Sequence, residues 1–565
     1  RPFFIEGRNI LSFRLMGGDG DMASDNLFYT RRVGRSPQYY PETDGFVRTP
    51  EATTIIGAFK LTGKTRSGLS VGVIESLTGA ESASVFAGGV TDRVAVEPLT
   101  NYFGLRLQKD FHEGGTTIGG MVTAVYRRLG AAQLDFLHDR AFTGGLDLYH
   151  SWKKKTLYFS LKLLGSAVHG SPEALLRTQT SPLRYFQRPD AGHLALDPAR
   201  TSLSGHGGTV EFGKQGGSHV MYSVGATWRS PGFELNDMGF LGGADEIMQW
   251  TWAGYRVWKP FAIFRTLNVN FNQWTGWNFG GTNIFAGGNV NVNFQLKNYW
   301  NGGFGVNRNF IGLSAAMLRG GPSMRVPGAW NFWGNVQTDM RQKVRFTLMA
   351  QSYRRDNGEA ESLTLRAGII VNPSRAFSVS LLPTFGLNRN ELQYLATTAL
   401  DGEPRYVFGR IEQKTAGLTV RLNYSLTPDL SVQLYGQPFV ASGGYSRFKR
   451  IADPKSRTWT DRYRVFGDAA LAYDEAAGAY AVDEDLDGAV DYVFSRPDFN
   501  FLELRTNLVV RWEYRPGSVL FLVWSQGRTG YDSMGDFSLG RDLGSLFHVH
   551  PRNVFLVKFS YGFQL

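Results

Sequence analysis

Residues 290–297 are Val-Asn-Val-Asn-Phe-Gln-Leu-Lys, a strict alternation of apolar and polar side chains. Successive side chains of an extended strand point to opposite faces, so this segment has two different faces. The apolar face carries Val290, Val292, Phe294 and Leu296, and the polar face carries Asn291, Asn293, Gln295 and Lys297. A dry core cannot hold such a polar face, because each buried polar group without a partner costs free energy. The segment therefore predicts a strand with one oily face and one wet face.

The same alternation recurs in segments that are far apart in the chain, at 157–163, 266–272 and 503–514. In a barrel of an outer membrane, the apolar set faces lipid and the polar set faces the lumen. A soluble β-sandwich would instead turn its polar set outward to water, and a single strand does not distinguish the two. The number of strands and the positions of the turns decide between them.

Short segments with turn chemistry alternate with longer polar connections along the whole chain. The short turns lie near Gly63–Gly68, His112–Gly115, Lys153–Lys155, Gln215–Ser218, Lys259–Pro260, Asn301–Gly302, Arg341–Gln342, Asn372–Ser374, Thr427–Asp429 and Arg515–Gly517. The mostly longer connections lie at 34–52, 78–99, 129–138, 167–204, 231–244, 279–283, 313–327, 356–360, 388–415, 440–499 and 527–552. These hairpins, an opening strand at Leu27–Val33 and a closing strand at Val554–Leu565 predict about 22 strands, give or take about two to four.

The closing strand supports the same fold. Its apolar set is Phe555, Val557, Phe559, Tyr561, Phe563 and Leu565. Such an aromatic-rich terminal strand is similar to the signal that barrel-assembly machinery recognises, whereas the alternative is an edge strand that ends a soluble domain. Together with the turn pattern, it predicts an all-β fold: a transmembrane antiparallel up-and-down β-barrel with short periplasmic turns and long extracellular loops.

The composition excludes several other classes of protein. No run approaches the roughly 18 apolar residues of a membrane-spanning helix, so a helical membrane protein is excluded. The chain has no cysteine, which excludes disulfides and thiolate metal sites. The formal charge is +11, but the basic residues are scattered apart from short groups such as Lys153–Lys155, so nucleic acid is not an expected partner. The first residues lack the charged start and apolar core of a signal peptide, which favours a mature or truncated chain.

Three stretches resemble a known family: Arg1–Gly7, Leu27–Arg35 and Arg511–Gln526. They are similar to a family of uncharacterised outer-membrane barrels, a domain of unknown function that Bacteroidota and related phyla carry. The resemblance implies that a module similar to family 9 carbohydrate-binding domains precedes the barrel in the full-length protein. It supports the fold more than an activity, and it supplies no catalytic residues.

The sharpest local motif lies inside the longest expected loop, at residues 483–491. It places Asp483, Asp485, Asp487 and Asp491 at positions 1, 3, 5 and 9 of a calcium loop, with Gly488 at position 6. Phe494 stands where such a loop has glutamate at position 12. The motif predicts a structural Ca²⁺ site that orders the loop, and the alternative is a solvated acidic loop.

Basic residues recur on the polar face of the expected strands. They are Lys162, Lys297, Arg345, Arg366, Arg421, Arg505, Arg511 and Lys558, with Glu503 and Glu513 as partial counterweights. A basic lumen wall would favour anionic solutes or hold an acidic internal segment. The alternative is that these charges pair with one another and fill the barrel.

These observations predict a multi-pass β-barrel in the outer membrane of a Gram-negative bacterium, at residues 26–565, after a segment 1–25 that is a lumen plug or a linker. The expected function is a channel or transporter component for bulky nutrients, with glycans suggested by the family resemblance alone. An alternative is a surface binding or scaffold protein in which the loops 167–204 and 440–499 contact a protein or lipoprotein partner. No nucleophile or acid–base constellation stands out in the sequence, so an enzyme such as a barrel hydrolase is not expected.

Overall fold

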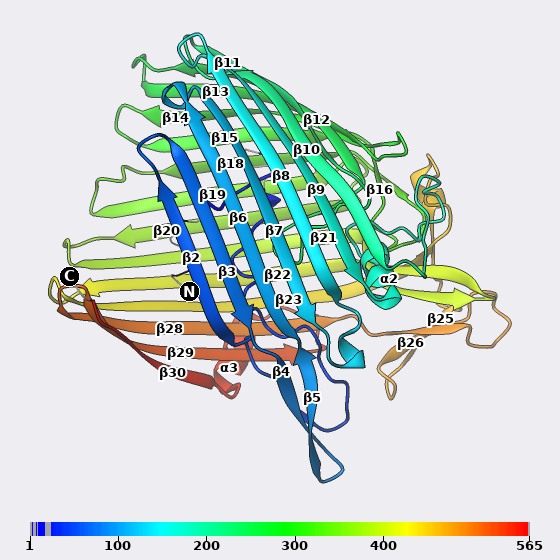
Figure 1. Cartoon of the computed structure of the whole chain (residues 1–565). Coiled ribbons are helices and arrows are strands. Elements are labelled where there is room, and N and C mark those ends of the chain that lie inside the picture. The colour runs from blue at the N-terminus through cyan, green and yellow to red at the C-terminus, as the bar shows by residue number, and fades with distance from the viewer. Residues whose placement is uncertain (1–2, 4–6, 8, 17–23, 563–565) are drawn as a thin grey trace. The chain divides into compact units, whose positions relative to one another are not determined.

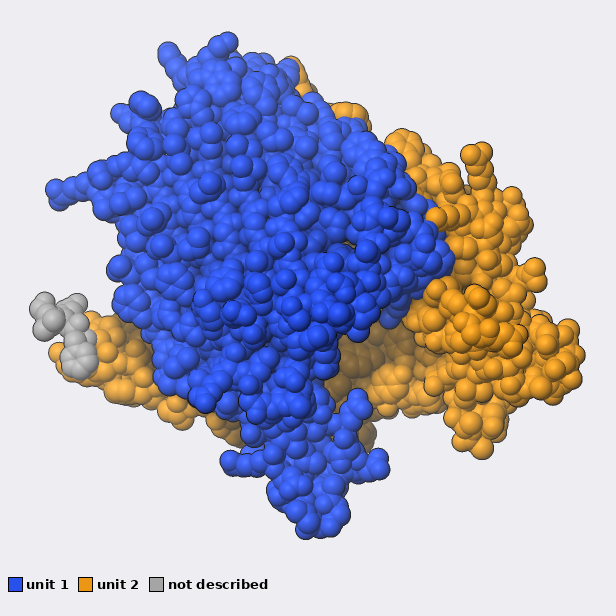
Figure 2. Space-filling model, turned by 45° about the vertical axis from the view of Figure 1, so that its right-hand side comes forward, with its two compact units in different colours: residues 1–254, 272–286, 313–324 blue, residues 255–271, 287–312, 325–565 orange. Residues whose placement is uncertain are grey.

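The computed structural model describes residues 3, 7, 9–16 and 24–562. Strands dominate this part of the chain, and 22 of them belong to one antiparallel sheet (Figure 1). No helix in these residues combines the length and the apolar content that crossing a membrane requires. Two compact units are distinguished (Figure 2): unit 1 comprises Arg1–Gly254, Asn272–Ala286 and Leu313–Met324, and unit 2 comprises Tyr255–Phe271, Gly287–Gly312 and Arg325–Leu565.

Unit 1 contains a sheet whose strands pair in chain order from β2 to β11, with the hairpin β4–β5 inserted between β3 and β6. Its elements are β1 (Phe46–Arg48), β2 (Ile55–Lys64), β3 (Leu69–Thr78), β4 (Glu81–Ala87), β5 (Val90–Glu97), β6 (Leu99–Phe111), η2 (His112–Gly114), β7 (Thr116–Arg128), η3 (Ala132–Leu134), β8 (His138–Trp152), β9 (Leu157–Gly170), α2 (Pro172–Thr180), β10 (Ser202–Lys214) and β11 (Val220–Arg229). Residues of both units form β12 (Glu246–Val257), β13 (Phe264–Trp277), β14 (Asn283–Leu296), β16 (Gly312–Ser314) and β17 (Met324–Val326).

Unit 2 continues with the longest strands of the molecule, again paired in chain order. Its elements are β15 (Asn301–Asn309), β18 (Ala329–Gln337), β19 (Val344–Arg355), β20 (Ala360–Val371), β21 (Phe377–Leu400), β22 (Glu403–Ser425), β23 (Leu430–Ile451), η4 (Trp459–Arg462), β24 (Tyr463–Val465), β25 (Leu471–Asp474), β26 (Ala479–Val482), β27 (Tyr492–Ser495), β28 (Phe499–Arg515), β29 (Ser518–Asp532), α3 (Leu539–His548) and β30 (Arg552–Ser560).

Nine of the ten predicted tight turns are confirmed at their positions, and a short connection lies next to the tenth. One turn is displaced: residues 297–300 make it, and Asn301–Gly302 begin β15. Two other predictions are wrong. Leu27–Val33 form no strand, and the predicted loop 388–415 is largely strand, since β21 and β22 pair as far as Leu400 and Glu403. The count of 22 strands therefore includes the three-residue β24 in place of an opening strand.

The error at 388–415 has a clear physical cause. Beyond the apolar part of a strand both faces meet water, so the period-two pattern that reveals a half-buried strand disappears. The hairpin is closed by Asp401 and Gly402, whose φ angles are +54° and +78°. An Asp-Gly pair with positive φ at both residues is a strong hairpin signal, and that signal stands in the sequence.

The sheet of unit 1 has an inner face that is apolar and covered. Its wall residues Ile74, Tyr102, Met121, Val125 and Leu164 are buried. They pack in one cluster with Leu11, Phe13, Leu15, Leu27, Phe28, Val33, Phe233, Leu235, Met238 and Leu241. We call the covering segments, residues 9–16, 24–33 and 230–245, the inner layer. Burial of each large apolar side chain stabilises the folded state by about 1.5–3 kcal/mol, so the inner layer and the wall share a core.

Ion pairs hold the inner layer to the wall of unit 1. The carboxylate of Asp237 lies 2.6 Å from Arg127 and 2.9 Å from His138. A second pair joins Asp25 and Arg229 at 3.0 Å. All of these side chains are largely buried, so removal of one partner would leave an uncompensated charge in a poorly solvated place.

The sheet of unit 2 keeps the two different faces that the alternation predicts. One face, which we call the apolar belt, is solvent-accessible and carries Phe346, Leu348, Leu365, Leu381, Phe385, Leu387, Leu522, Val557 and Phe559. Cross-strand pairing aligns these residues: Leu365 opposes Phe385, and Leu522 opposes Val557. A soluble monomer rarely exposes so extensive an apolar surface, which indicates an apolar environment around this face.

Candidate functional site

In unit 2, the polar face of β14, β15 and β18, together with Asn270 of β13, is rich in side-chain amides. We call this set the amide face: Asn270, Asn289, Asn291, Asn293, Gln295, Asn307, Asn331 and Asn335. Asn291 accepts from the amides of Asn270 at 2.8 Å and Asn293 at 3.1 Å. Asn307 donates to Asn331 at 2.9 Å. Each amide has two donor hydrogens and an oxygen with two lone pairs, so these bonds leave further capacity.

An aromatic ring lies within the amide face. Trp333 on β18 is directly opposite Gly305 on β15, which in turn opposes Asn291 on β14. A Cβ atom added to Gly305 would lie 2.6 Å from the indole, so only glycine leaves room for the ring there. The arrangement combines neutral hydrogen-bonding groups with an aromatic surface. It can bind an uncharged ligand that has both hydroxyl groups and C–H faces.

The predicted basic residues fall into several environments. On the strands of unit 2, Arg345 and Arg366 share the face of Thr347 and Thr364, and Arg421 lies 5.4 Å from the ring of Tyr435. Lys558 lies 5.5 Å from the ring of Phe521. In unit 1, Lys162 donates to the carbonyl of Arg14 in the inner layer at 2.7 Å. Lys297 is exposed in the turn between β14 and β15, outside the strand.

Two of the basic residues are neutralised by glutamates on their own strand. Arg505 lies 2.7 Å from Glu503, and Arg511 lies 2.5 Å from Glu513. The residues of each pair are two positions apart, so they share a face of β28. A continuous positive wall is therefore absent from the face of β28.

The acidic motif occupies the connection between β26 and β27. Carboxylate oxygens of Asp483, Asp485 and Asp491 all lie within 4.8 Å of one another. Asp487 points elsewhere, since its carboxylate accepts the backbone N–H of Ala489 at 2.8 Å. Phe494, at the position of the missing glutamate, is buried in a core that β25–β27 share with Val407 and Phe448.

The loop geometry resembles the tight turn of a cation site. Backbone N–H groups of Asp487 and Gly488 donate to Asp485 at 3.2 Å and to Asp483 at 2.9 Å. The bond from Asp487 lowers the pKa of Asp485, but desolvation and the surrounding carboxylates outweigh it and leave that pKa above its ordinary value. Three oxygens so close together suit a hard divalent cation, which would relieve their repulsion.

The family comparison matches almost the entire chain. The model described as "Domain of unknown function (DUF5916)" matches residues 1–563. The chain belongs to this family. The predicted resemblance to an uncharacterised family is thereby confirmed, whereas the carbohydrate-binding-like module ahead of this DUF5916 chain and the range of phyla stay predictions. A search of curated proteins found no match.

Solved structures similar to the DUF5916 chain are porins and receptors. An anion-selective porin from Comamonas acidovorans has 11% identity and a TM-score of 0.27, over 58% of this chain and 91% of the porin. The siderophore receptor PirA from Acinetobacter baumannii has 8% identity and a TM-score of 0.35, over 82% of this chain and 76% of the receptor. A ferric enterobactin receptor mutant from Pseudomonas aeruginosa has 9% identity and a TM-score of 0.34, over 82% of this chain and 76% of the receptor. No residue role is transferred from them.

Sequence reasoning found some of this site and missed the rest. It placed Asn291, Asn293 and Gln295 on one polar face, but it singled out the charged residues there as the important ones. The place of Trp333 on this face was missed, although Asn331 and Asn335 each lie two positions from it on the same strand. That spacing was the available signal.

Proposed function

We propose that this protein is an outer-membrane channel or transporter component for bulky hydroxylated solutes, with glycans as the substrate class. The observation that carries the proposal is the amide face with Trp333 at its centre. We infer no catalytic activity.

The membrane location is supported by the apolar belt of unit 2. Strands of about 9–11 residues cross the hydrocarbon core, and every strand from β18 to β23 except the nine-residue β18 exceeds that length. Aliphatic and aromatic side chains alternate with polar ones along these strands, as they do where one face meets lipid and the other a lumen. We propose that the sheet closes into a barrel of about 22 strands, since closure removes the unpaired strand edges.

The choice of glycans follows from the chemistry of the inner faces. Sugars present hydroxyl groups that both donate and accept hydrogen bonds, which matches amides better than it matches carboxylates or ammonium groups. Sugar rings also present C–H faces that pack on an indole. The pairing of Arg505 with Glu503 and of Arg511 with Glu513 weakens the case for a wall selective for anions.

The inner layer fits this function as a plug. Residues 9–16 and 24–33 cover the wall of unit 1 through the same apolar cluster that includes residues 233–241. We propose that the segment 1–25, of which the structure describes residues 3, 7, 9–16 and 24–25, acts as part of this plug and not as a free linker.

The proposal is tested by reconstitution of the full chain into planar bilayers with a neutral oligosaccharide. We expect a measurable ion conductance that the oligosaccharide blocks reversibly, and a block weakened at least about fivefold in N291L/W333L. V290L/V292L is the matched control, because these two residues lie on the opposite face of β14. A reconstituted protein with neither conductance nor oligosaccharide binding would contradict the proposal.

A second candidate function, a barrel-anchored scaffold, is favoured by the connection between β24 and β28. It contains the small sheet β25–β27, whose Val482, Tyr492 and Phe494 pack in one core with Val407 of β22 and Phe448 of β23. Leu486, Val490 and Val493 are exposed on this sheet and its turn. Exposed apolar side chains on this small sheet suit a protein or lipoprotein partner. A sealed barrel that co-purifies with one stoichiometric protein, lost on L486S/V490S, would support this function instead.

A further inference from the structure

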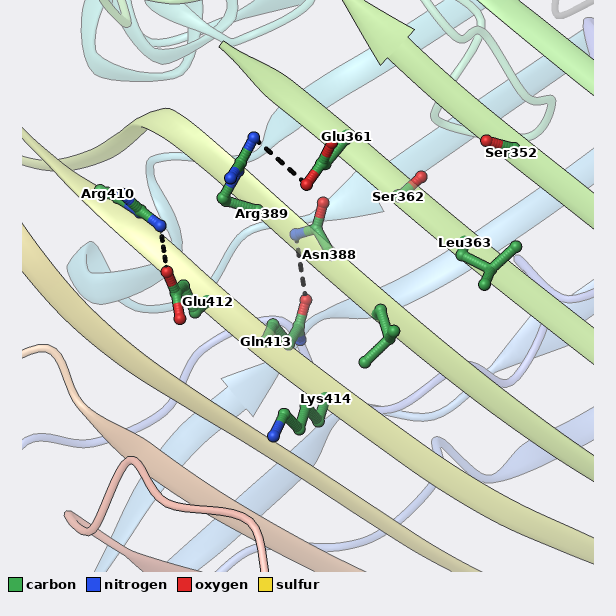
Figure 3. Close-up of a pocket in the computed structure, with 11 residues that line it drawn as sticks. Ser352, Glu361, Ser362, Leu363, Asn388, Arg389, Arg410, Glu412, Gln413 and Lys414 are labelled. Atoms are coloured by element: carbon green, nitrogen blue, oxygen red, sulfur yellow. Dashed lines mark hydrogen bonds and ion pairs between the residues drawn. The ribbon is translucent and has the colours of Figure 1, made fainter. Parts of the chain in front are cut away.

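A polar depression interrupts the outer face of unit 2, on strands β19 to β22 (Figure 3). Its volume is about 440 Å³. It is lined by Ser352, Glu361, Ser362, Leu363, Leu387, Asn388, Arg389, Arg410, Glu412, Gln413 and Lys414. We call it the rim pocket.

The rim pocket lies on the same face as the apolar belt. Cross-strand pairing aligns Leu363 with Leu387 and Leu387 with Lys414 in one row. The next row toward the turns is Leu365, Phe385 and Ala416, which is apolar throughout. The next row away from the turns is Glu361, Arg389 and Glu412, which is charged throughout. The pocket therefore stands at the boundary where the apolar belt ends.

The position along the strands agrees with this boundary. β21 begins at Phe377, directly after the tight turn, and Leu387 is the last apolar residue of its outward row before Arg389. That distance is about the length of strand that crosses the hydrocarbon core. β21 then continues to Leu400, beyond the belt. Lipid headgroups occupy this level of a bilayer, between the hydrocarbon and the surrounding water.

In the rim pocket the two arginines form ion pairs, whereas the lysine, among the described residues, does not. Arg389 pairs with Glu361 at 3.2 Å, and Arg410 pairs with Glu412 (Figure 3). Arg410 also lies 3.5 Å from Glu391. Lys414 is exposed and forms no ion pair with any residue that the structure describes. Its ammonium stands in the row of Leu363 and Leu387, so a ligand bound there would contact both a cation and apolar side chains.

We propose that the rim pocket binds the phosphorylated headgroup of a lipid in the outer leaflet. Lys414 contributes the main charge to the phosphate, and the guanidinium groups of Arg389 and Arg410 donate further hydrogen bonds. Leu363 and Leu387 contact the first methylene groups of the acyl chains. Glu361 and Glu412 hold the two guanidinium groups in place and reduce the attraction for a small free anion, which favours a ligand that is also anchored by its chains.

The inference rests on the membrane location proposed above. It is tested with the full chain purified in a mild detergent, by native mass spectrometry of the retained lipid. The probes are a phosphorylated glycolipid, the same glycolipid without phosphate, and inorganic phosphate. We expect retention of the phosphorylated lipid, and about a tenfold or greater loss of that retention in R389Q/K414Q. R457Q/R464Q is the matched control, since it removes the same charge from two exposed positions outside the pocket, Arg457 in the connection after β23 and Arg464 in β24.

The outcomes separate the possibilities. Equal retention by R389Q/K414Q and wild type would overturn the proposal, as would equal affinity for the glycolipid without phosphate. Displacement of the lipid by millimolar inorganic phosphate would assign the pocket to a free anion instead. A preparation that retains no lipid of any kind would contradict the membrane location itself. Unchanged circular dichroism and gel migration of the folded form establish that each variant is folded.

Discussion

The inner face of the sheet is apolar and covered in unit 1, whereas in unit 2 it is polar and accessible. In unit 1, Ile74, Met121 and Leu164 on the wall are buried beneath the inner layer. In unit 2, the equivalent positions carry amides such as Asn291 and Asn293, which bond to one another. The outer faces of both sheets are apolar and accessible, for example at Leu146 and Phe346. The same strand architecture therefore supports a packed core in one unit and a wet binding surface in the other.

Both sheets have alternating faces, so the kind of residue on the inner face, and not the alternation of residues along the strand, determines what lies against that face. Polar inner residues bond laterally and stay accessible, whereas apolar ones require a cover. The two faces should therefore respond differently to substitution.

The largest difference is expected for buried and exposed ion pairs. Asp237→Ala leaves Arg127 and His138 without their carboxylate inside unit 1, and we expect a loss of about 3–5 kcal/mol in unfolding free energy. Asp356→Ala in unit 2 removes the partner of Arg308 near the surface, and we expect a loss below about 1 kcal/mol. Thermal or denaturant unfolding in detergent measures both. Equal losses would refute the distinction between the two units.

An effect of similar size is expected for apolar packing. The guanidinium of Arg106 lies 4.9 Å from the centroid of the Phe13 ring. A Cβ atom added to Gly145 would lie 2.8 Å from the same ring, so the ring packs closely against the wall. Phe13→Ala therefore opens a cavity between the inner layer and the wall, with an expected cost of about 3–5 kcal/mol at most. Limited proteolysis should cut the variant's inner layer while the strands stay intact. A variant as resistant as wild type would argue against a shared core.

The smallest effect on global stability is expected at the acidic turn of unit 2. If Asp483, Asp485 and Asp491 hold Ca²⁺, a chelator should accelerate proteolysis between β26 and β27 several-fold and leave the sheet unchanged. Asp485→Asn should be sensitive to protease with or without chelator. Identical cleavage rates for the wild type with calcium and with chelator would remove the site.

Much of the architecture could be predicted from the sequence because each strand and turn carries a local signal. The turns at Thr427–Asp429 and Arg515–Gly517 have the residues that tight turns need, and the alternation around Asn291 gives the correct faces. The inner layer could not be predicted in the same way. Leu11, Phe13 and Leu235 lie in segments that show no alternation of apolar and polar residues. Some of the residues that they pack against are more than two hundred positions away in the sequence.

The candidate sites also differ in whether they depend on local spacing or on residues far apart in the sequence. The acidic cluster follows from spacing within nine residues, so three of its four predicted carboxylates converge. The rim pocket depends on the lateral registers of four strands, which place Glu361, Arg389 and Glu412 in one row. Leu27–Val33 failed as a strand because consecutive apolar side chains, such as Leu27 and Phe28, are buried together in the core of unit 1.

The inner layer has a consequence for the order of folding. Asn26 bridges to both Arg14 and Phe240, so the layer is completed by a segment that is synthesised more than two hundred residues later. Closing so long a loop is slow relative to the formation of neighbouring hairpins. We therefore expect residues 9–16 to dock only after the hairpins from β2 to β11 have formed. Any factor that holds an extended, apolar chain end during this interval would determine the yield of the folded protein.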